Sequence, residues 1–252
     1  MATTENTAVE KAKAAVTKTQ TEATHSKADQ VADFIQRNLA PYVDDLLINR
    51  IGRDRWIRVA LTAFKSTPKL TECTMISIGQ SLLNAATMGL EVNTPAGEAY
   101  LVPRYNKHTR QQEATLQIGY QGLLKLVYEA EDVRDVTAHV VREGDEFEYE
   151  EGLDKKLRWK AGTTRGEVTG AFALIRTTKG GEYTAYMPVA DIEALRKRGG
   201  DADFSPWKTD YEMMCCKTVL RRATKYMRRT RALVTAQVVD EQPTDMEVGD
   251  GE

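Results

Sequence analysis

The sequence predicts an α+β fold: N-terminal helices, then a mostly antiparallel sheet with β-hairpins, then a long basic C-terminal helix, with a disordered tail at each end. Two observations predict it. Apolar residues recur every three or four positions near both ends of the chain, as in amphipathic helices, whereas the middle alternates apolar and polar residues between turns, as strands do. Helices and strands do not alternate regularly, which favours α+β over a parallel α/β sheet.

Three amphipathic helices are predicted first. They cover residues 29–39, 53–67 and 71–90, each with one apolar stripe at helical spacing. Pro68 lies just past the second helix, and Gly89 is a plausible C-terminal stop for the third. The stripes contain Val31, Phe34, Ile35 and Leu39 in the first helix, Trp56, Val59, Ala60 and Phe64 in the second, and Met75, Ile78, Leu82, Leu83 and Ala86 in the third.

The strands follow in two hairpins. "EAYLVPRYN" and "EATLQIG" flank a polar loop and predict a hairpin with a basic tip. After a short helix in "YQGLLKLVYEA", the segment "DVTAHVVREGDEFEYE" alternates like a strand, and a second hairpin turns at Gly180–Gly181. A helix then runs from Pro188 to Gly199, and the last helix is expected from Trp207 to about Arg229.

The organisation we expect is one domain, residues 29–231, between two tails. Residues 1–28 have almost no large apolar side chains, and we expect them to be disordered. Residues 232–252 carry six acids and no Lys or Arg, and we expect a flexible acidic tail. No apolar run approaches a membrane helix, and the N-terminus lacks the apolar core of a signal peptide, so we expect the protein in the cytoplasm.

The distribution of charge is more informative than its total. The formal net charge is −2, yet outside the acidic tail the 35 Lys and Arg face only 31 of the 37 Asp and Glu. "PWKTDYEMMCCKTVLRRATKYMRRTR", residues 206–231, holds eight of the cations and two acids. On a helix, Lys217, Arg221, Lys225 and Arg228 form one stripe beside an apolar stripe, with Arg222 next to it. Such repelling charges favour a polyanion partner over a merely solvated basic face.

Further candidates are basic and aromatic residues in other parts of the sequence. The hairpin tip and the following short helix add cations, and aromatic rings lie among them, on which bases stack for ~1–3 kcal/mol each. Each ring taken alone is more often a core residue. The complete set of DNA-binding candidates is Lys217, Arg221, Arg222, Lys225, Arg228, Arg104, Lys107, Arg110, Gln117, Tyr120, Lys125, Trp207 and Lys208.

Enzymatic motifs are few. The acidic run "EGDEFEYEEG" offers Asp145, Glu146 and Glu148 as ligands for Mg²⁺ in a nuclease, but alternation puts its glutamates on one strand face, which favours a solvated or ion-paired edge. The sequence has no GxxxxGK[ST] phosphate loop, so nothing in it indicates ATP hydrolysis. The three cysteines suggest neither a disulfide framework nor a zinc site, so no cofactor is required by any motif and Mg²⁺ stays possible.

Several of these segments, in this order, resemble the RecT family of phage-type single-strand annealing proteins. The matching features are the first hairpin, the "QIGYQGL" turn, the "EGDEF" box and the "PW…Y.EM..KT..RR..K" helix, and the resemblance covers roughly residues 30–230. It implies a protein, not an enzyme, that binds single-stranded DNA and the annealed duplex and assembles into homo-oligomeric rings or filaments. It also implies a phage or prophage origin in a bacterial host, with an exonuclease and host single-strand-binding protein as partners.

Four functions stay open at this point. The first is ATP-independent annealing of complementary strands in phage-type recombination. The others are passive coating of single-stranded DNA, a Mg²⁺-dependent nuclease, and a scaffold whose basic helix docks an acidic protein. The acidic tail could compete with DNA for the basic surface, recruit a partner, or keep a cationic protein in solution.

Overall fold

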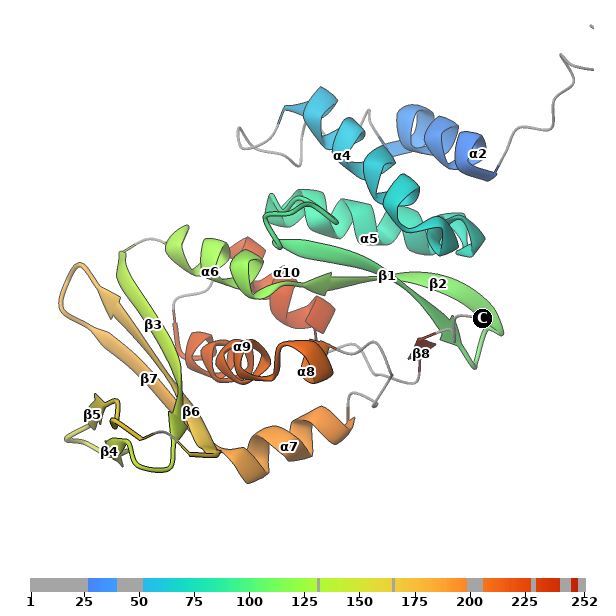
Figure 1. The fold of residues 1–252 in the computed structure, drawn as a ribbon. Coiled ribbons are helices and arrows are strands. Elements are labelled where there is room, and N and C mark those ends of the chain that lie inside the picture. The colour runs from blue at the N-terminus through green and yellow to red at the C-terminus, as the bar shows by residue number, and fades with distance from the viewer. Residues whose placement is uncertain are drawn as a thin grey trace, which may run out of the picture.

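The computed structural model describes residues 27–39, 52–130, 132–164, 166–198, 206–227, 230–240 and 246–248. Its elements confirm the predicted α+β fold (Figure 1). The tail predicted over residues 1–28 lies outside the described residues, except for the last two, with which the first helix begins. In chain order the elements are α2 (Lys27–Phe34), η1 (Ile35–Leu39), α4 (Arg53–Ser66), η2 (Pro68–Glu72), α5 (Met75–Met88), β1 (Ala99–Asn106), β2 (Gln111–Ile118), α6 (Tyr120–Tyr128), β3 (Val133–Arg142), β4 (Glu146–Glu150), β5 (Lys156–Lys160), β6 (Val168–Thr177), β7 (Glu182–Pro188), α7 (Val189–Arg198), α8 (Pro206–Thr209), α9 (Tyr211–Thr224), α10 (Arg231–Asp240) and β8 (Met246–Val248).

The three predicted N-terminal helical segments are confirmed. At the start of α5 the Thr74 side chain accepts a hydrogen bond from the backbone N–H of Ser77 at 3.3 Å, which satisfies one of the free donors of the first turn. At its end Gly89 adopts φ 67°, a left-handed conformation that costs glycine no Cβ clash. None of the helices in the described ranges has the length and apolar character needed to cross a membrane.

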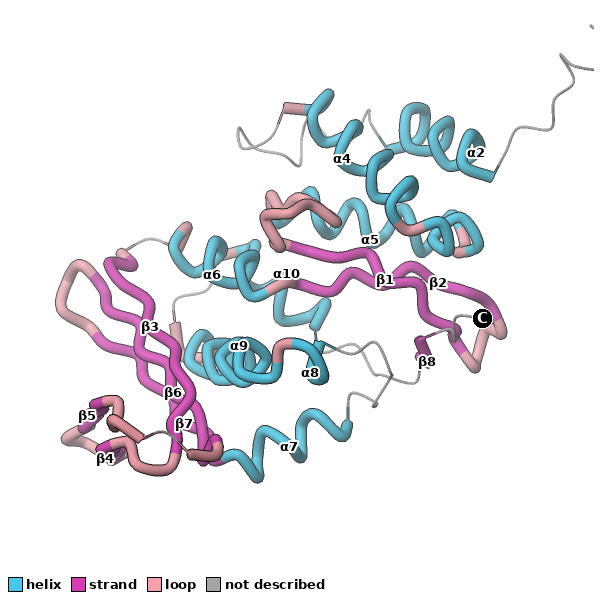
Figure 2. The backbone as a smooth tube through the Cα atoms, viewed as in Figure 1, coloured by secondary structure: helices cyan, strands magenta, loops and turns pink. Residues whose placement is uncertain are grey.

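β1 and β2 form the predicted first hairpin, a long antiparallel ribbon that lies beside α5 (Figure 2). Helix α5 covers the outer edge of β2. The backbone N–H of Ala114 donates to the Ser77 hydroxyl at 2.9 Å, and the Ser81 hydroxyl donates to the Ala114 carbonyl at 2.8 Å. Because these side chains use the groups of β2 that point away from β1, further strands can join this ribbon only beside β1.

The second sheet has the strand order β3-β6-β7 and is antiparallel throughout, with the predicted turn at Gly180–Gly181. Alternate residues of β6 point to opposite faces. Ala171, Ala173 and Ile175 join the main core, where α9 packs on this sheet. On the other face, Phe172 meets Phe147 of the β4–β5 hairpin, with ring centroids 5.8 Å apart.

The acidic segment is one of the places where the strand prediction needs refinement. A turn at residues 143–145 divides the predicted strand into β3 and β4. Within β4 the predicted alternation is confirmed, since the three glutamates are exposed while Phe147 and Tyr149 are half-buried. Strand β5, which the sequence analysis did not anticipate, pairs with β4 and completes a small two-stranded sheet.

The long basic C-terminal helix is the element that the structure corrects. The predicted helix from Trp207 to Arg229 is broken at Asp210, where φ is −135° and ψ is 51°, and ends again after Thr224. After that break, the hydroxyl of Thr230 accepts a hydrogen bond from the Leu233 N–H at 3.2 Å and caps a new helix. Neither break has a glycine or proline to reveal it in the sequence.

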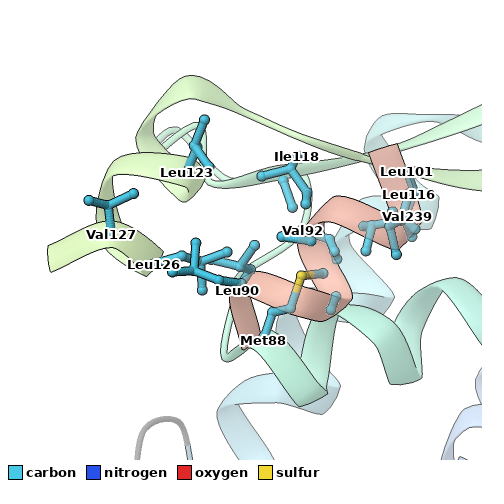
Figure 3. Close-up of a cluster of buried hydrophobic side chains, with 14 of the residues drawn as sticks. Met88, Leu90, Val92, Leu101, Leu116, Ile118, Leu123, Leu126, Val127 and Val239 are labelled. Carbon is cyan, nitrogen blue, oxygen red and sulfur yellow. The ribbon is translucent and has the colours of Figure 1, made fainter. Parts of the chain in front are cut away.

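The new helix, α10, occupies the first part of the segment expected to be a flexible tail. Leu233, Ala236 and Val239 are buried at spacings of three, and α10 packs against α5, β2 and α6. Figure 3 shows Val239 beside Leu101 and Leu116 of the hairpin. The acids of the tail all follow Val239, so overall charge concealed a short apolar stripe. Further on, β8 pairs with β1.

Two glycines of the "QIGYQGL" segment fix how α6 meets the first hairpin. A Cβ atom at Gly119 would lie 2.0 Å from the Gly97 carbonyl oxygen, and one at Gly122 would lie 2.0 Å from the Glu98 carbonyl oxygen. The Gly119 N–H also donates to the Glu98 carbonyl at 2.8 Å. The backbone before β1 therefore lies directly against α6, at a separation that only glycine permits.

We expect Gly122→Ala to destabilise the protein although alanine is the better helix former. Helix propensity favours alanine by ~1 kcal/mol, but the overlap with backbone at 2.0 Å cannot be relieved by a rotamer change. Overpacking of this kind costs about 1–3 kcal/mol or more, so the midpoint of urea unfolding should fall. Gly152→Ala is the control, because nothing lies within 4 Å of a Cβ there. Equal midpoints for the two variants would contradict the close contact.

Candidate nucleic-acid interface

Three predicted DNA-binding residues lie at the C-terminal end of α9. Arg222 and Lys225 are exposed and Arg221 is half-buried. The carbonyl groups at this end of a helix favour cations by ~0.3–1 kcal/mol, which offsets part of the repulsion between like charges at i,i+4. The repulsion alone therefore does not require a polyanion. Arg228 lies outside the described residues.

Lys217 departs from the predicted cationic stripe. It is only 9% exposed and lies in the middle of α9, beside the buried Cys216 and one turn before the buried Leu220. Its position is thus within the packed side of the helix, whereas Arg222 and Lys225 face solvent. The exposed cations of this helix begin at Arg222, later than the spacing of basic residues suggested.

The tip of the first hairpin is an ordered basic turn. Lys107 and Arg110 are exposed there. The Asn106 side-chain oxygen accepts hydrogen bonds from the backbone N–H groups of His108 and Thr109, at 2.9 and 3.3 Å. These bonds hold the turn in shape, so its two cationic side chains start from a fixed backbone.

Arg104 lies further down β1 and is half-buried. Burial lowers the pKa of its guanidinium group. Its Nε atom is buried and has no hydrogen-bond partner among the described residues. A buried donor without an acceptor is unfavourable, so this group is suited to an acceptor-rich ligand such as a phosphate.

Aromatic and amide side chains gather at the other end of the hairpin. Gln117 of β2 is the register partner of Tyr100 of β1, which is 43% exposed. Tyr120 is the first residue of α6, and burial raises the pKa of its hydroxyl to about 12. Tyr100 is therefore partly open to solvent across from Gln117, while Tyr120 is largely a packing residue.

Lys125 has a structural role that accounts for its whole ammonium group. Its Nζ donates to the Gly89 carbonyl at 2.9 Å and to both carboxylate oxygens of Glu98, each at 2.9 Å. The second Glu98 oxygen also accepts from the Glu91 backbone N–H. Lys125 thus joins α6 to the end of α5 and the start of β1, which is a structural role and not that of a DNA contact.

The short helix α8 divides its two candidates between core and solvent. Trp207 is half-buried and packs against Tyr211 with ring centroids 6.0 Å apart. Lys208 is exposed. From Tyr211 to Lys225 helix α9 measures ~21 Å at 1.5 Å per residue, so α8 and the basic end of α9 lie a full helix length apart.

The acidic segment is already occupied by internal contacts. Asp145 accepts hydrogen bonds from the Gly162 N–H at 2.9 Å and the Trp159 ring N–H at 3.1 Å. Glu146 pairs with Lys160 at 2.9 Å, and Glu148 pairs with Lys156 at 2.6 Å. Among the residues that the structure describes, no group of three or more His, Cys, Asp and Glu side chains could hold a metal ion.

The cysteines are packing residues. Cys73, Cys215 and Cys216 are buried free thiols. Burial raises the pKa of the Cys215 thiol to about 11 and that of Cys216 to about 12. Both thiols are therefore protonated at neutral pH and lack the thiolate character that reactive cysteines need.

Two further residues join the surface at the end of α9. Tyr226 is 73% exposed directly after Lys225, and Arg231 is exposed at the start of α10. Both belong to the basic stretch that was visible in the sequence. Tyr226 is one of the aromatic rings that lie among these cations in the sequence, whereas Arg231 lies past the predicted end of the last helix at about Arg229.

The candidates form two cationic groups, one at the end of α9 and one at the tip of the first hairpin. They lie on different sides of the junction where α6 meets the backbone before β1. Arg221 lines a small cavity with Leu123 of α6 and with Leu233 and Gln237 of α10, so the end of α9 lies against α6. The hairpin begins at this junction and carries its tip one strand length away, ~24 Å for β2 at 3.4 Å per residue. Figure 1 shows the hairpin tip well away from the β3-β6-β7 sheet, on which α9 packs.

Comparison with known proteins identifies a family and relatives by sequence. The RecT family model matches residues 54–249. Protein RecT of Escherichia coli (strain K12) is 32% identical over 236 residues, which cover 90% of this chain and 88% of that protein. "Uncharacterized protein YqaK" of Bacillus subtilis (strain 168) is 26% identical over 162 residues, or 64% of this chain and 54% of that protein. The chain therefore belongs to the RecT family of phage-type DNA recombination and single-strand annealing proteins.

Proposed function

We propose that this protein binds single-stranded DNA and anneals complementary strands without ATP, along a surface that runs from the end of α9 to the tip of the first hairpin. The observation that carries the proposal is the exposure of cationic groups at both places, Arg222 and Lys225 on one and Lys107 and Arg110 on the other. Membership of the RecT family supports the same function.

The chemistry of annealing requires little more than such a surface. Two single strands repel each other through their phosphates, and neutralisation by lysine and arginine removes that barrier. Contacts to the backbone leave the base edges free to test pairing. Stacking then releases about 1.4 kcal/mol per base step on average. The sequence has no phosphate loop for ATP, and the proposed reaction needs none.

The length of the first hairpin sets a scale for the DNA that one subunit can contact. A strand length of ~24 Å corresponds to about seven nucleotides at 3.4 Å per nucleotide of one strand. A longer DNA would then need several copies side by side. We propose that the protein assembles into a homo-oligomeric ring or filament and works with a phage exonuclease and host single-strand-binding protein, as the family resemblance implies.

Of the alternatives, the nuclease loses most support. Its proposed carboxylates, Asp145, Glu146 and Glu148, already hold backbone, indole and lysine partners within the β4–β5 region. Passive coating of single-stranded DNA would use the same cationic surface and is distinguished by its effect on pairing.

One experiment separates these functions. Complementary labelled oligonucleotides are mixed with the protein in the absence of ATP, with and without Mg²⁺, and duplex formation is followed over time. Faster pairing than in buffer supports the proposal. Blocked pairing would indicate passive coating, shortened strands a nuclease, and an unchanged rate a protein that does not act on DNA.

We expect the double variant Arg222→Ala/Lys225→Ala to weaken binding about equally for all DNA sequences, because these side chains would contact phosphates rather than bases. Each lost contact should reduce the slope of log affinity against log salt by roughly 0.7 for single strands. The measurement is a titration at several salt concentrations. Lys160→Ala is the matched control, an exposed lysine on β5 that pairs with Glu146. The same slope in the double variant and the wild type would remove these residues from the site.

We expect Lys107→Glu/Arg110→Glu to slow annealing strongly while leaving the thermal melting temperature nearly unchanged. Both side chains are exposed, and the turn is held by Asn106 rather than by either cation. Charge reversal therefore repels phosphates without removing a structural bond. The annealing rate and the melting curve are measured on the same preparation. Normal annealing would show that the tip is only a solvated turn.

A further inference from the structure

The outer edge of β1 is occupied by a segment from the far end of the chain. Strand β8 pairs antiparallel with β1, and the register partners are Arg104 with Val248, Tyr105 with Glu247 and Asn106 with Met246. The sheet order is β2-β1-β8, so the C-terminal segment lies alongside the half of the hairpin that leads to its basic tip (Figure 1).

The outer edge of β1 can pair with a further strand near its end, where β8 lies, but not near its start. Nearer its start, the Leu101 N–H donates to the Asn93 side chain at 2.7 Å, and the Ala99 carbonyl accepts from the Asn93 N–H at 2.8 Å. These bonds show that odd-numbered residues of β1 turn their backbone groups outward. Pro103 has no N–H to offer at its outward position. Tyr105 is therefore the residue whose backbone groups face β8, and Glu247 is its partner in the register.

The docked segment is opposite in charge to the surface that it joins. From Ala232 to Glu252 the sequence has six acids and no lysine or arginine, and Glu247 is part of β8 itself. On the hairpin side, Arg104 precedes and Lys107 follows the central pair. The acidic segment thus lies where the proposed function requires phosphates.

The pairing is short but tethered. Three paired residues form a marginal strand on their own. However, Val239 is buried in α10, and only six residues separate it from Met246. A linker of this length gives the segment an effective concentration in the millimolar range. A weak contact can therefore be occupied much of the time and still yield to a ligand with more contacts.

We propose that the edge of β1 at Arg104–Asn106 is a docking site for the chain's own acidic C-terminal segment, and that docking there competes with DNA for the hairpin. The proposal rests on the proposed function for its competitor, but not for the docking itself. DNA that enters the hairpin surface displaces the segment, which then regains its freedom. Until that happens, the protein is held in a state with lower affinity for weak or non-specific polyanions.

The first test reads docking without DNA. Hydrogen exchange of the Tyr105 amide is compared between the full chain and a chain ending at Asp240, a cut that keeps the buried Val239 of α10. Exchange should be faster in the shorter chain. Equal exchange would overturn the proposal, as would protection that grows with protein concentration, because the occupant would then be the tail of another copy.

The second test separates strand pairing from charge alone. Glu247→Gln and Glu247→Pro remove the same charge, but only proline also removes the backbone N–H and disfavours the strand. If the segment is docked between half and nine-tenths of the time, the shorter chain should bind a single-stranded oligonucleotide about 2- to 10-fold more tightly. Glu247→Pro should approach that gain and Glu247→Gln should fall short of it.

The outcomes distinguish the two proposals. Equal affinities for Glu247→Pro and Glu247→Gln would show that charge alone matters and would overturn strand docking. If all forms bind the oligonucleotide with equal affinity, the competition is overturned while the proposed function stays intact. Failure of every form to bind DNA would overturn the proposed function and the competition together, and the exchange of Tyr105 would still report whether the segment docks.

Discussion

The close contact that the backbone of Gly97 and Glu98 makes with Gly119, just before α6, and Gly122, in its first turn, determines how the parts of this protein are placed. A side chain at either glycine would meet a carbonyl oxygen at 2.0 Å, so the start of β1 and the first turn of α6 have one relative position. The Glu98 carboxylate adds to this junction by receiving Lys125 and the Glu91 N–H. Backbone contact of this kind is stiff, because no rotamer change can relieve it.

The proposed DNA surface depends on that junction without containing it. The first hairpin projects from one side of it, while α6 packs against α9 and so locates the basic end of that helix. Side chains that meet phosphates can be flexible and exposed, but the backbone elements that carry them must keep their separation if one DNA strand is to contact both. Lys125 illustrates the division, since it has the charge of a DNA ligand and serves instead to fix the scaffold.

Local patterns in the sequence predicted elements well where the signals were themselves local. Both hairpins, the N-terminal helices and the inward turn of Phe147 and Tyr149 follow from periodicity and turn residues. The start of a new helix at Arg231 did not, because it depends on the cap at Thr230 and on the burial of Leu233, which involves residues far along the chain. The same limit explains Lys217 and Lys125. A helical pattern shows that a lysine lies on a face, but only tertiary packing decides whether that face meets solvent, an acidic partner or the interior.

The position of the cations on α9 also bears on the speed of binding. Arg221 and Arg222 lie in the last turn, where the helix itself stabilises positive charge. The helix therefore fixes the backbone positions of both cations before any ligand arrives. An approaching polyanion meets a ready-made positive field that extends about 10 Å at 0.1 M salt. Encounter with such a surface is governed by electrostatic steering, so association should be rapid and sensitive to ionic strength.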